Sequence, residues 1–296
     1  MAHGPDIVAH LIVGSRPEPY LAAVLDSIEG VCAHAVVNDN SGTMPGPNDE
    51  ILHGSRFARD DRLTIDRSAF TGFADARNAC IDATPARFAG AWTLFVDADE
   101  VHGDELPRMG SLLSALPSDV DAVDGYSRHF VGSFAWWLSV ERRLCFFRAR
   151  DDRRWSGRIH EHLDPIGRRA VLPCVWSHYG HVVTPRMEWE KSRLYSSLGQ
   201  AGFAPTDAEL SVVDAAMAWG RMRPDVMRYR GEHPPAARPL IRELATRWAA
   251  TFADVDALFA RCSTVERLRR TLRRANYSRM IALRGIEAGA RWGWTA

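Results

Sequence analysis

Apolar and polar residues are spaced in two different ways along the chain. In the first half, short apolar runs at 7–14, 33–37 and 63–66 are separated by stretches such as 17–29 and 73–83, in which apolar residues recur every three or four positions. Short runs predict strands, and the longer spacing predicts helices. A helix at 104–116 and strands at 121–130 and 143–148 continue the series. Strands that alternate with helices indicate an α/β fold, with a mainly parallel sheet packed between helices.

The spacing of apolar residues changes at about residue 185. Helical spacing dominates at 188–198, 207–219, 238–252 and 255–274, and the proline-rich stretch 231–239 interrupts it. We therefore predict a catalytic domain at 1–185 and a helical C-terminal region at 186–296. Residues 238–296 hold 12 arginines against 5 acidic residues. Such a basic tail can contact an anionic membrane, but a solvated helix face with homodimer contacts is the simpler interpretation, because the arginines are interleaved with ordinary helix-core residues.

One predicted strand ends in a cluster of carboxylates. Residues 91–101 read AWTLFVDADEV, an apolar run that stops at Asp97 and Asp99. Central parallel strands are buried on both faces, and open α/β sheets bind ligands beyond the carboxyl ends of such strands. Two carboxylates at i and i+2 there offer oxygen ligands to a hard divalent cation and leave positions for a diphosphate. The alternative is that residues 97–100 cap a following helix.

Two other polar clusters accompany these carboxylates. The loop Asn38–Gly42 follows the second strand, where short side chains can reach a nucleobase or a ribose, although ordinary turn chemistry explains the loop equally well. Four of the eleven histidines fall between residues 155 and 181, with Glu161 between the first two: His160, His162, His178 and His181. Histidine is the commonest metal ligand. The crowding indicates a site, although any single histidine can be structural.

Composition excludes several classes of protein. The formal net charge is zero, so no global charge points to nucleic acid. The five cysteines are scattered and include no CxxC pair, which argues against a disulfide framework or structural zinc and fits a reduced cytoplasm. No segment approaches 18 apolar residues, and no basic stretch precedes the first apolar run. We therefore expect a soluble cytoplasmic protein. Lys191 is the only lysine among 37 basic residues, which we interpret as codon bias from a GC-rich genome.

Five segments together resemble a known family. In chain order they are VVNDNSG (36–42), FADARNACIDA (73–83), LFVDADEV (94–101), WSGRIHEHL (155–163) and SHYGHV (177–182). Their order and spacing are similar to those of family 2 glycosyltransferases of the GT-A fold, in the bacterial branch with ARN, LDADE and WxGx-hydrophobic-HE motifs. The resemblance spans roughly residues 5–185. It implies a transferase that moves a sugar from a UDP-, GDP- or TDP-sugar to a small-molecule, glycan or lipid-linked acceptor.

The resemblance also implies roles for side chains in all five segments. These are Asp39 at the base and ribose, Arg77 and Asn78 near the diphosphate, Asp97 and Asp99 as the DXD-type pair that binds Mn²⁺ or Mg²⁺, His178 as a further metal ligand, and Glu161 facing the acceptor. Two departures stand out: the family's Gly-Asp-Trp entry to the DADE strand is missing at 88–92, and Asn40 occupies a position where many relatives have glycine.

Elementary chemistry agrees with these roles. A divalent cation stabilises the charge that a departing nucleoside diphosphate acquires. An inverting transfer also needs a base to take the acceptor's proton, and Glu161 is our first candidate, with His160 second. If residues 158–163 are extended, His160 and His162 share one face and Glu161 points to the other.

Two alternatives remain open. His160 and His162, joined by His178 or His181, would make a zinc site for hydrolysis, although metal-hydrolase spacings such as HExxH are absent. A non-catalytic nucleotide-sugar-binding module is the other. For a transferase, we expect the acceptor surface at 132–142, including Trp136 and Trp137, together with the helical tail.

Overall fold

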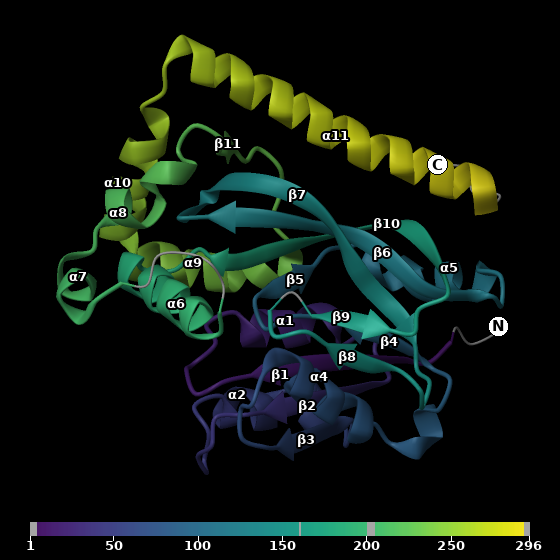
Figure 1. Ribbon diagram of the computed structural model, residues 1–296. Helices are drawn as coiled ribbons and strands as arrows, with labels where there is room; N and C mark the ends of the chain where they lie inside the picture. Colours follow the sequence, from purple (N-terminus) through teal and green to yellow (C-terminus); the bar gives the residue numbers. More distant parts are fainter. Residues whose placement is uncertain (1–4, 160, 200–204, 293–296) are drawn as a thin grey trace.

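A mixed central sheet forms the middle of the molecule (Figure 1). The computed structural model describes residues 5–159, 161–199 and 205–292, with side chains up to residue 280. The strand order is β3-β2-β1-β4-β7-β6-β10-β5, and β11 pairs with β7. The strands are β1 (Ile7–Val13), β2 (His34–Asp39), β3 (Leu63–Arg67), β4 (Trp92–Phe95), β5 (Glu100–His102), β6 (Val120–Val131), β7 (Ser133–Arg148), β10 (Arg168–His181) and β11 (Met227–Arg228).

The first half of the sheet is parallel and has helices on both faces. β1 pairs in parallel with β2 and β4, and β2 pairs in parallel with β3. Alternate residues of β1 face opposite layers, as in any strand: Leu11 packs with Val24 of α1, whereas Val8 packs with Cys80 of α4. The predicted α/β class is confirmed. The helices of this half are α1 (Leu21–Ile28), α2 (Asp49–Gly54), α3 (Arg56–Arg59), α4 (Phe73–Asp82) and α5 (Met109–Ala115).

The segment 91–101 contains two strands, and the apolar pattern predicts only the first of them. β4 stops at Phe95, and Glu100 begins β5, which pairs antiparallel with β10. Asp97 and Asp99 therefore lie in the connection between two strands. Because a strand follows them, the alternative of a helix cap is wrong. The local sequence does not predict β5, because β5 forms by hydrogen bonding to β10, which lies some 75 residues further along the chain.

Two long antiparallel strands and a small hairpin complete the α/β part. β6 pairs antiparallel with β7, and β10 runs parallel to β6. β8 (Arg154–Ser156) and β9 (His162–Asp164) form a separate two-stranded sheet near α4 (Figure 1).

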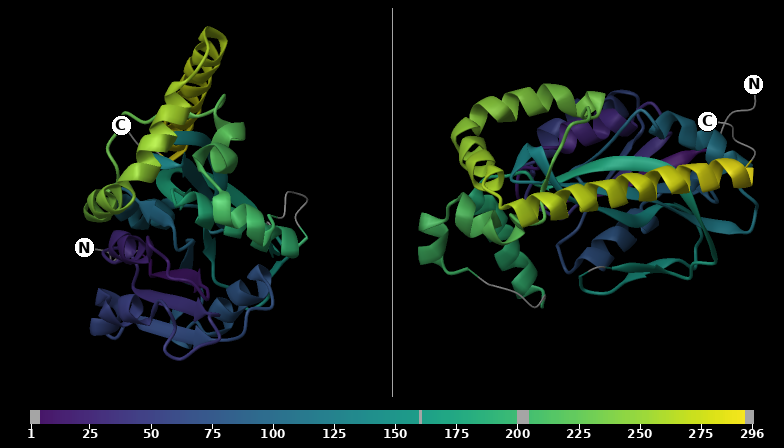
Figure 2. Two further views of the ribbon diagram at one scale, coloured as in Figure 1. Left: turned by 90° about the vertical axis from the view of Figure 1, so that its left-hand side faces the viewer. Right: turned by 90° about the horizontal axis from the view of Figure 1, so that it is seen from above.

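Each segment predicted to be helical after residue 185 contains helix, but three of them, 207–219, 238–252 and 255–274, are each divided between two helices. The helices are α6 (Pro185–Ser197), α7 (Asp207–Val212), α8 (Ala215–Trp219), α9 (Arg238–Arg247), α10 (Ala249–Ala260) and α11 (Thr264–Trp292). The long helix α11 lies along the sheet over β10 and β11 (Figure 2). Within the described residues, no helix is both long and apolar enough to cross a membrane. The division of the chain at residue 185 and the homodimer or membrane contact of the tail stay predictions.

Trp136 and Trp137 belong to the core, so the prediction that they form an acceptor platform is wrong. Their exposed fractions are 4% and 6%. The indole Nε1 of Trp136 donates to Asp256 Oδ1 at 2.7 Å, and the Trp137 ring packs against Tyr277. The reason is that the C-terminal helices, which supply Asp256 and Tyr277, cover this part of β7.

Candidate active site

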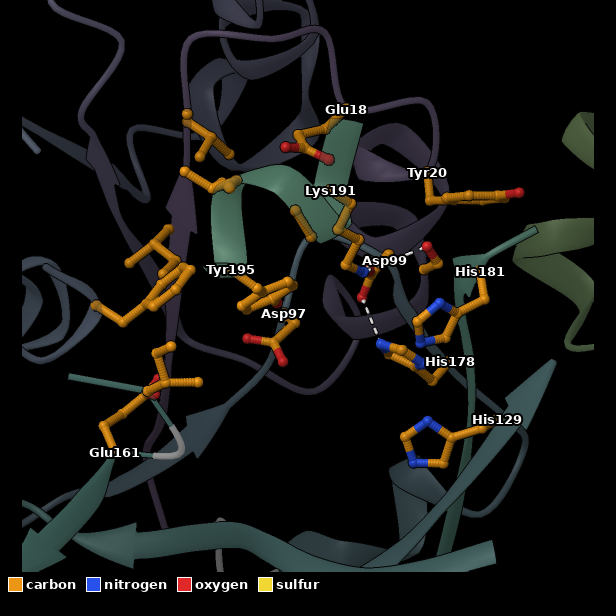
Figure 3. Close-up of a pocket in the computed structure, with 18 of the residues that line it drawn as sticks. Glu18, Tyr20, Asp97, Asp99, His129, Glu161, His178, His181, Lys191 and Tyr195 are labelled. Atoms are coloured by element: carbon orange, nitrogen blue, oxygen red, sulfur yellow. Dashed lines mark hydrogen bonds and ion pairs between the residues drawn. The ribbon is translucent and has the colours of Figure 1, made fainter. Parts of the chain in front are cut away.

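A cavity of about 1420 Å³ lies where β1 and β4 end. Its walls come from the loop 14–20 after β1, the connection between β4 and β5, the end of β10, the β8–β9 hairpin, and helices α6 and α8. Of the residues predicted for the site, five line this cavity: Arg77, Asp97, Asp99, Glu161 and His178. Figure 3 shows the labelled carboxylates and histidines of this set around a common space.

Asp97 is a half-buried carboxylate held by two arginines. Arg77 Nη2 lies 2.5 Å from its Oδ1, and Arg143 Nη2 lies 3.3 Å from its Oδ2. Burial by itself raises the pKa of Asp97, but the two guanidinium groups outweigh it and bring the pKa to about 2. Asp97 is therefore a fixed negative charge, and both of its oxygens are already engaged.

Asp99 is engaged far less completely. Its Oδ1 is buried and accepts no hydrogen bond within the described residues, and His178 Nε2 lies 3.3 Å from it. Its Oδ2 lies 3.9 Å from Lys191 Nζ. A β-carbon built on Gly180 would overlap Oδ2 and would come within 2.9 Å of His178 Nε2. Only glycine at position 180 lets the carboxylate and the imidazole come this close to the backbone of β10.

The His178 side chain is neutral and is placed where it can bind a metal ion. Burial lowers its pKa well below the usual value, and the neighbouring His129 lowers it further. The two rings lie 4.5 Å apart between centroids. A neutral imidazole beside a buried carboxylate with an unused oxygen fits a divalent cation. No three His, Cys, Asp or Glu side chains in the described part of the chain form a preformed metal shell.

Arg77 connects the metal side of the cavity with Glu161. Its Nε donates to Glu161 Oε1 at 2.6 Å, while Nη2 binds Asp97. The guanidinium lies over the Phe95 ring, 4.0 Å from its centroid. One buried cation thus fixes the positions of two carboxylates from segments far apart in the sequence.

A second arginine supports the same turn. Arg143 on β7 binds Glu100 Oε1 at 2.8 Å as well as Asp97. Burial raises the pKa of Glu100 to about 7 despite this partner. Glu100 Oε2 accepts a hydrogen bond from the backbone N–H of Asp97 at 3.1 Å. The last acidic residue of the DADE motif therefore shapes the turn that presents Asp97 and Asp99.

Two residues that were predicted to bind the donor instead bind other residues of the protein. Asp39 accepts from the Ser41 N–H and pairs with Arg67, and it is not among the residues that line the cavity. The Asn78 amide donates to the Trp155 carbonyl at 3.0 Å and accepts from the Trp155 N–H at 2.8 Å. Both ends of this amide are used to hold the β8–β9 hairpin against α4. Contact of Asp39 and Asn78 with a nucleotide sugar stays a prediction.

The described histidines of this cluster bind different partners, although the rings of His178 and His181 lie 5.8 Å apart between centroids, and the zinc-site alternative is not favoured. His162 is 65% exposed on the hairpin and binds Ser156 and Asp164. His181 binds Glu188 through Nδ1 at 3.0 Å. His160, the second candidate for the base, lies outside the described residues. Of the three described histidines, His178 alone contacts a carboxylate of the DADE motif.

Sequence reasoning missed three residues of the cavity. Glu18 lies in the loop after β1, and burial together with Asp99 raises its pKa to about 7, although Lys191 opposes this shift. Lys191 on α6 faces Asp99 (Figure 3). Gly180 lets Asp99 and His178 approach the backbone of β10, as described above. Glu18 carries no sequence signal, but the single lysine of an arginine-rich chain and the glycine of SHYGHV were visible signals.

The fold and site define an α/β protein with a carboxylate and histidine centre at the end of its parallel strands. No family model matches the chain, and no curated protein matches it. Two solved structures that it resembles are the mannosyltransferase PcManGT from Pyrobaculum calidifontis in complex with GDP-Man and Mn²⁺ and residues 1–349 of TarS from S. aureus. The first is 15% identical over 99% of this chain and 88% of that chain, with a TM-score of 0.42. The second is 14% identical over 97% and 92%, with a TM-score of 0.39.

Proposed function

We propose that this protein is a metal-dependent glycosyltransferase that moves a sugar from a nucleotide-diphosphate sugar to an acceptor hydroxyl with inversion. One observation carries the proposal. The buried Oδ1 of Asp99 accepts no hydrogen bond within the described residues, next to a neutral imidazole, and the missing β-carbon of Gly180 lets both side chains lie close to the backbone of β10. It lies at the edge of the sheet where α/β proteins bind their ligands.

Asp99 and His178 are the residues that would hold Mn²⁺ or Mg²⁺. Asp97 is already bound by two arginines, so its role is to add fixed negative charge beside the cation, and Asp99 is the direct ligand. A cation bound there would act as a Lewis acid that stabilises charge on the departing diphosphate.

Glu161 is the proposed base. Arg77 engages its Oε1, and we assign Oε2 to the proton of the acceptor hydroxyl. The acceptor oxygen attacks the anomeric carbon as its proton passes to Glu161, and the bond to the diphosphate breaks on the opposite face. One displacement of this kind inverts the anomeric configuration. His160 stays the second candidate.

We place the acceptor against the helical wall of the cavity. The part of this wall formed by α6 and its neighbours carries apolar side chains: Met187, Trp189, Leu194, Met217 and Met222. This wall replaces the tryptophan platform expected from the sequence, and it retains the expected contribution of the helical tail.

A thermal-shift screen tests the function. A ligand at one hundred times its Kd that binds only the folded state adds about 2.7 kcal/mol to the free energy of unfolding. We expect UDP, GDP or TDP to raise the Tm with Mn²⁺ present, followed by transfer of sugar from the matching donor in a product assay. Stabilisation by Zn²⁺ alone, with no effect of any nucleotide, would overturn the proposal in favour of the hydrolase.

A further inference from the structure

Lys191 differs from every other basic residue of the chain. It is the only lysine among 37 lysines and arginines, and α6 places it in the lining of the cavity. Its side chain is 28% exposed, and its ammonium lies 3.9 Å from Asp99 Oδ2 and 3.3 Å from the carbonyl oxygen of Gly180. Figure 3 shows it beside Asp99, between Glu18 and Tyr195.

The ammonium of Lys191 has unused donors, and among the described residues it makes no ion pair as close as those of the two arginines of the site. Arg77 is bound by Asp97 and Glu161, and Arg143 by Asp97 and Glu100. In the described part of the chain, Lys191 donates one hydrogen bond, to Gly180. An ammonium has three donors, so two remain for a ligand in the cavity.

The space around Lys191 suits a compact cation. A β-carbon on Gly180 would lie 2.9 Å from Nζ, so backbone and ammonium are close together. A guanidinium is planar and wider, and its fork matches one carboxylate or phosphate in a fixed plane. A lysine ammonium acts as a point charge that can serve a carboxylate and a phosphate at once.

We propose that Lys191 is a built-in cation for the diphosphate of the donor, and that it shares Asp99 with the divalent metal. The inference rests on the proposed function and deepens it. When the bond between the anomeric carbon and the diphosphate oxygen breaks, the electron pair stays on that oxygen. Lys191 keeps its proton and compensates the new charge by hydrogen bonding, while the proton of the acceptor goes to Glu161.

This arrangement has two consequences that can be measured without turnover. Nucleoside diphosphate binds in the absence of metal, though more weakly than with it, because Lys191 supplies one of the two cations. Mn²⁺ without nucleotide binds less tightly than the carboxylates alone would allow, because a positive charge already lies 3.9 Å from Asp99.

The test compares Lys191→Gln with wild type and with Arg193→Gln. Arg193 is also on α6, but it is exposed and paired with Asp207. Isothermal titration measures the Kd of UDP, GDP and TDP in EDTA and in Mn²⁺, and electron paramagnetic resonance of free Mn²⁺ measures metal affinity without nucleotide. We expect Lys191→Gln to weaken binding in EDTA by about tenfold or more, as for loss of a hydrogen bond to a charged group, and to tighten Mn²⁺ binding. Arg193→Gln should change neither.

A second variant and the melting temperature distinguish the loss of the Lys191 ammonium from misfolding. Lys191→Arg keeps the charge in a wider group, and we expect it to restore less than half of the lost metal-free binding. If Lys191→Gln retains the wild-type Tm, the wild-type Kd in EDTA and the wild-type Mn²⁺ affinity, the role of Lys191 is overturned. If wild type binds none of the nucleotides even with Mn²⁺, the proposed function itself fails, and the role of Lys191 fails with it.

Discussion

A methyl group on Gly180 would overlap the Oδ2 atom of Asp99. The backbone of β10 therefore sets how far the Asp99 carboxylate can extend. We expect Gly180→Ala to displace Asp99 and to weaken Mn²⁺ binding by about 10- to 100-fold, as for other changes that disturb the orientation of a metal ligand. Mn²⁺ titration followed by paramagnetic resonance measures the effect. Gly54→Ala is the control, since a β-carbon there meets nothing within 4 Å. An unchanged Mn²⁺ affinity in Gly180→Ala would remove Asp99 from the metal site.

Asp99→Asn should abolish metal-dependent binding of nucleotide and leave the fold intact. The amide keeps the shape of the carboxylate but not its charge, so the cost in turnover should reach about 10²-fold, as for other preorganised charge-stabilising groups. Isothermal titration with UDP or GDP and Mn²⁺ checks it, with Asp104→Asn in the exposed loop after β5 as control. Wild-type binding and turnover in Asp99→Asn would contradict the assignment.

The histidines separate the metal site from the hairpin. His178→Ala should lose Mn²⁺, because its Nε2 lies 3.3 Å from Asp99. His162→Ala should retain Mn²⁺, because that side chain binds Ser156 and Asp164 at the surface. Elemental analysis after dialysis gives the metal content of each variant. Loss of metal from both would revive the zinc site.

Glu161→Gln should reduce turnover by about 10²- to 10⁴-fold while donor binding stays near wild type, because a carboxamide cannot accept the acceptor's proton. The product should have inverted anomeric configuration, which NMR determines. Steady-state kinetics and titration of the donor separate rate from binding.

Glu161 also has a structural alternative, since it binds Arg77. If that is its main role, Glu161→Gln lowers the Tm and weakens donor binding together. If turnover is unchanged, Glu18 is the carboxylate to replace next, because its pKa near 7 suits a base.

His10 makes stability depend on pH. Burial in β1 lowers its pKa from 6.5 to about 3, with a smaller contribution from Arg77. Between these values the unfolded chain binds the proton and the folded chain does not, so the free energy of unfolding rises with pH by up to about 1.4 kcal/mol per unit. Urea unfolding at pH 5 and pH 7 should show a smaller difference in His10→Gln than in wild type. The same difference in both proteins would contradict the prediction, and the exposed His53→Gln serves as control.

The local pattern of apolar residues was sufficient to predict those elements that depend mainly on their own residues. β1, β2 and α4 lie within a residue or two of their predicted ranges, since each has a clear apolar rhythm. β5 was missed because the apolar pattern of 91–101 does not show where the chain turns. That turn depends on pairing with β10, which lies far along the sequence.

Long-range contacts decided which site residues meet. The position of Asp99 followed from the end of a buried strand, but nothing local distinguishes His178 from His162, which lie on different sheets. Lys191 was visible as the only lysine, and we interpreted it as codon bias because helix α6 gave no reason to place it near Asp99. Its role depends on how the helical tail folds back over the sheet.

The paired bonds between Asn78 and Trp155 join segments that are 77 residues apart. These hydrogen bonds therefore hold the β8–β9 hairpin at a fixed distance from helix α4, whatever the length of the chain between them. Insertions or deletions in the intervening loops would leave Arg77 and Glu161 facing each other. The geometry of the site therefore depends on this contact more than on the length of the chain that joins the two segments.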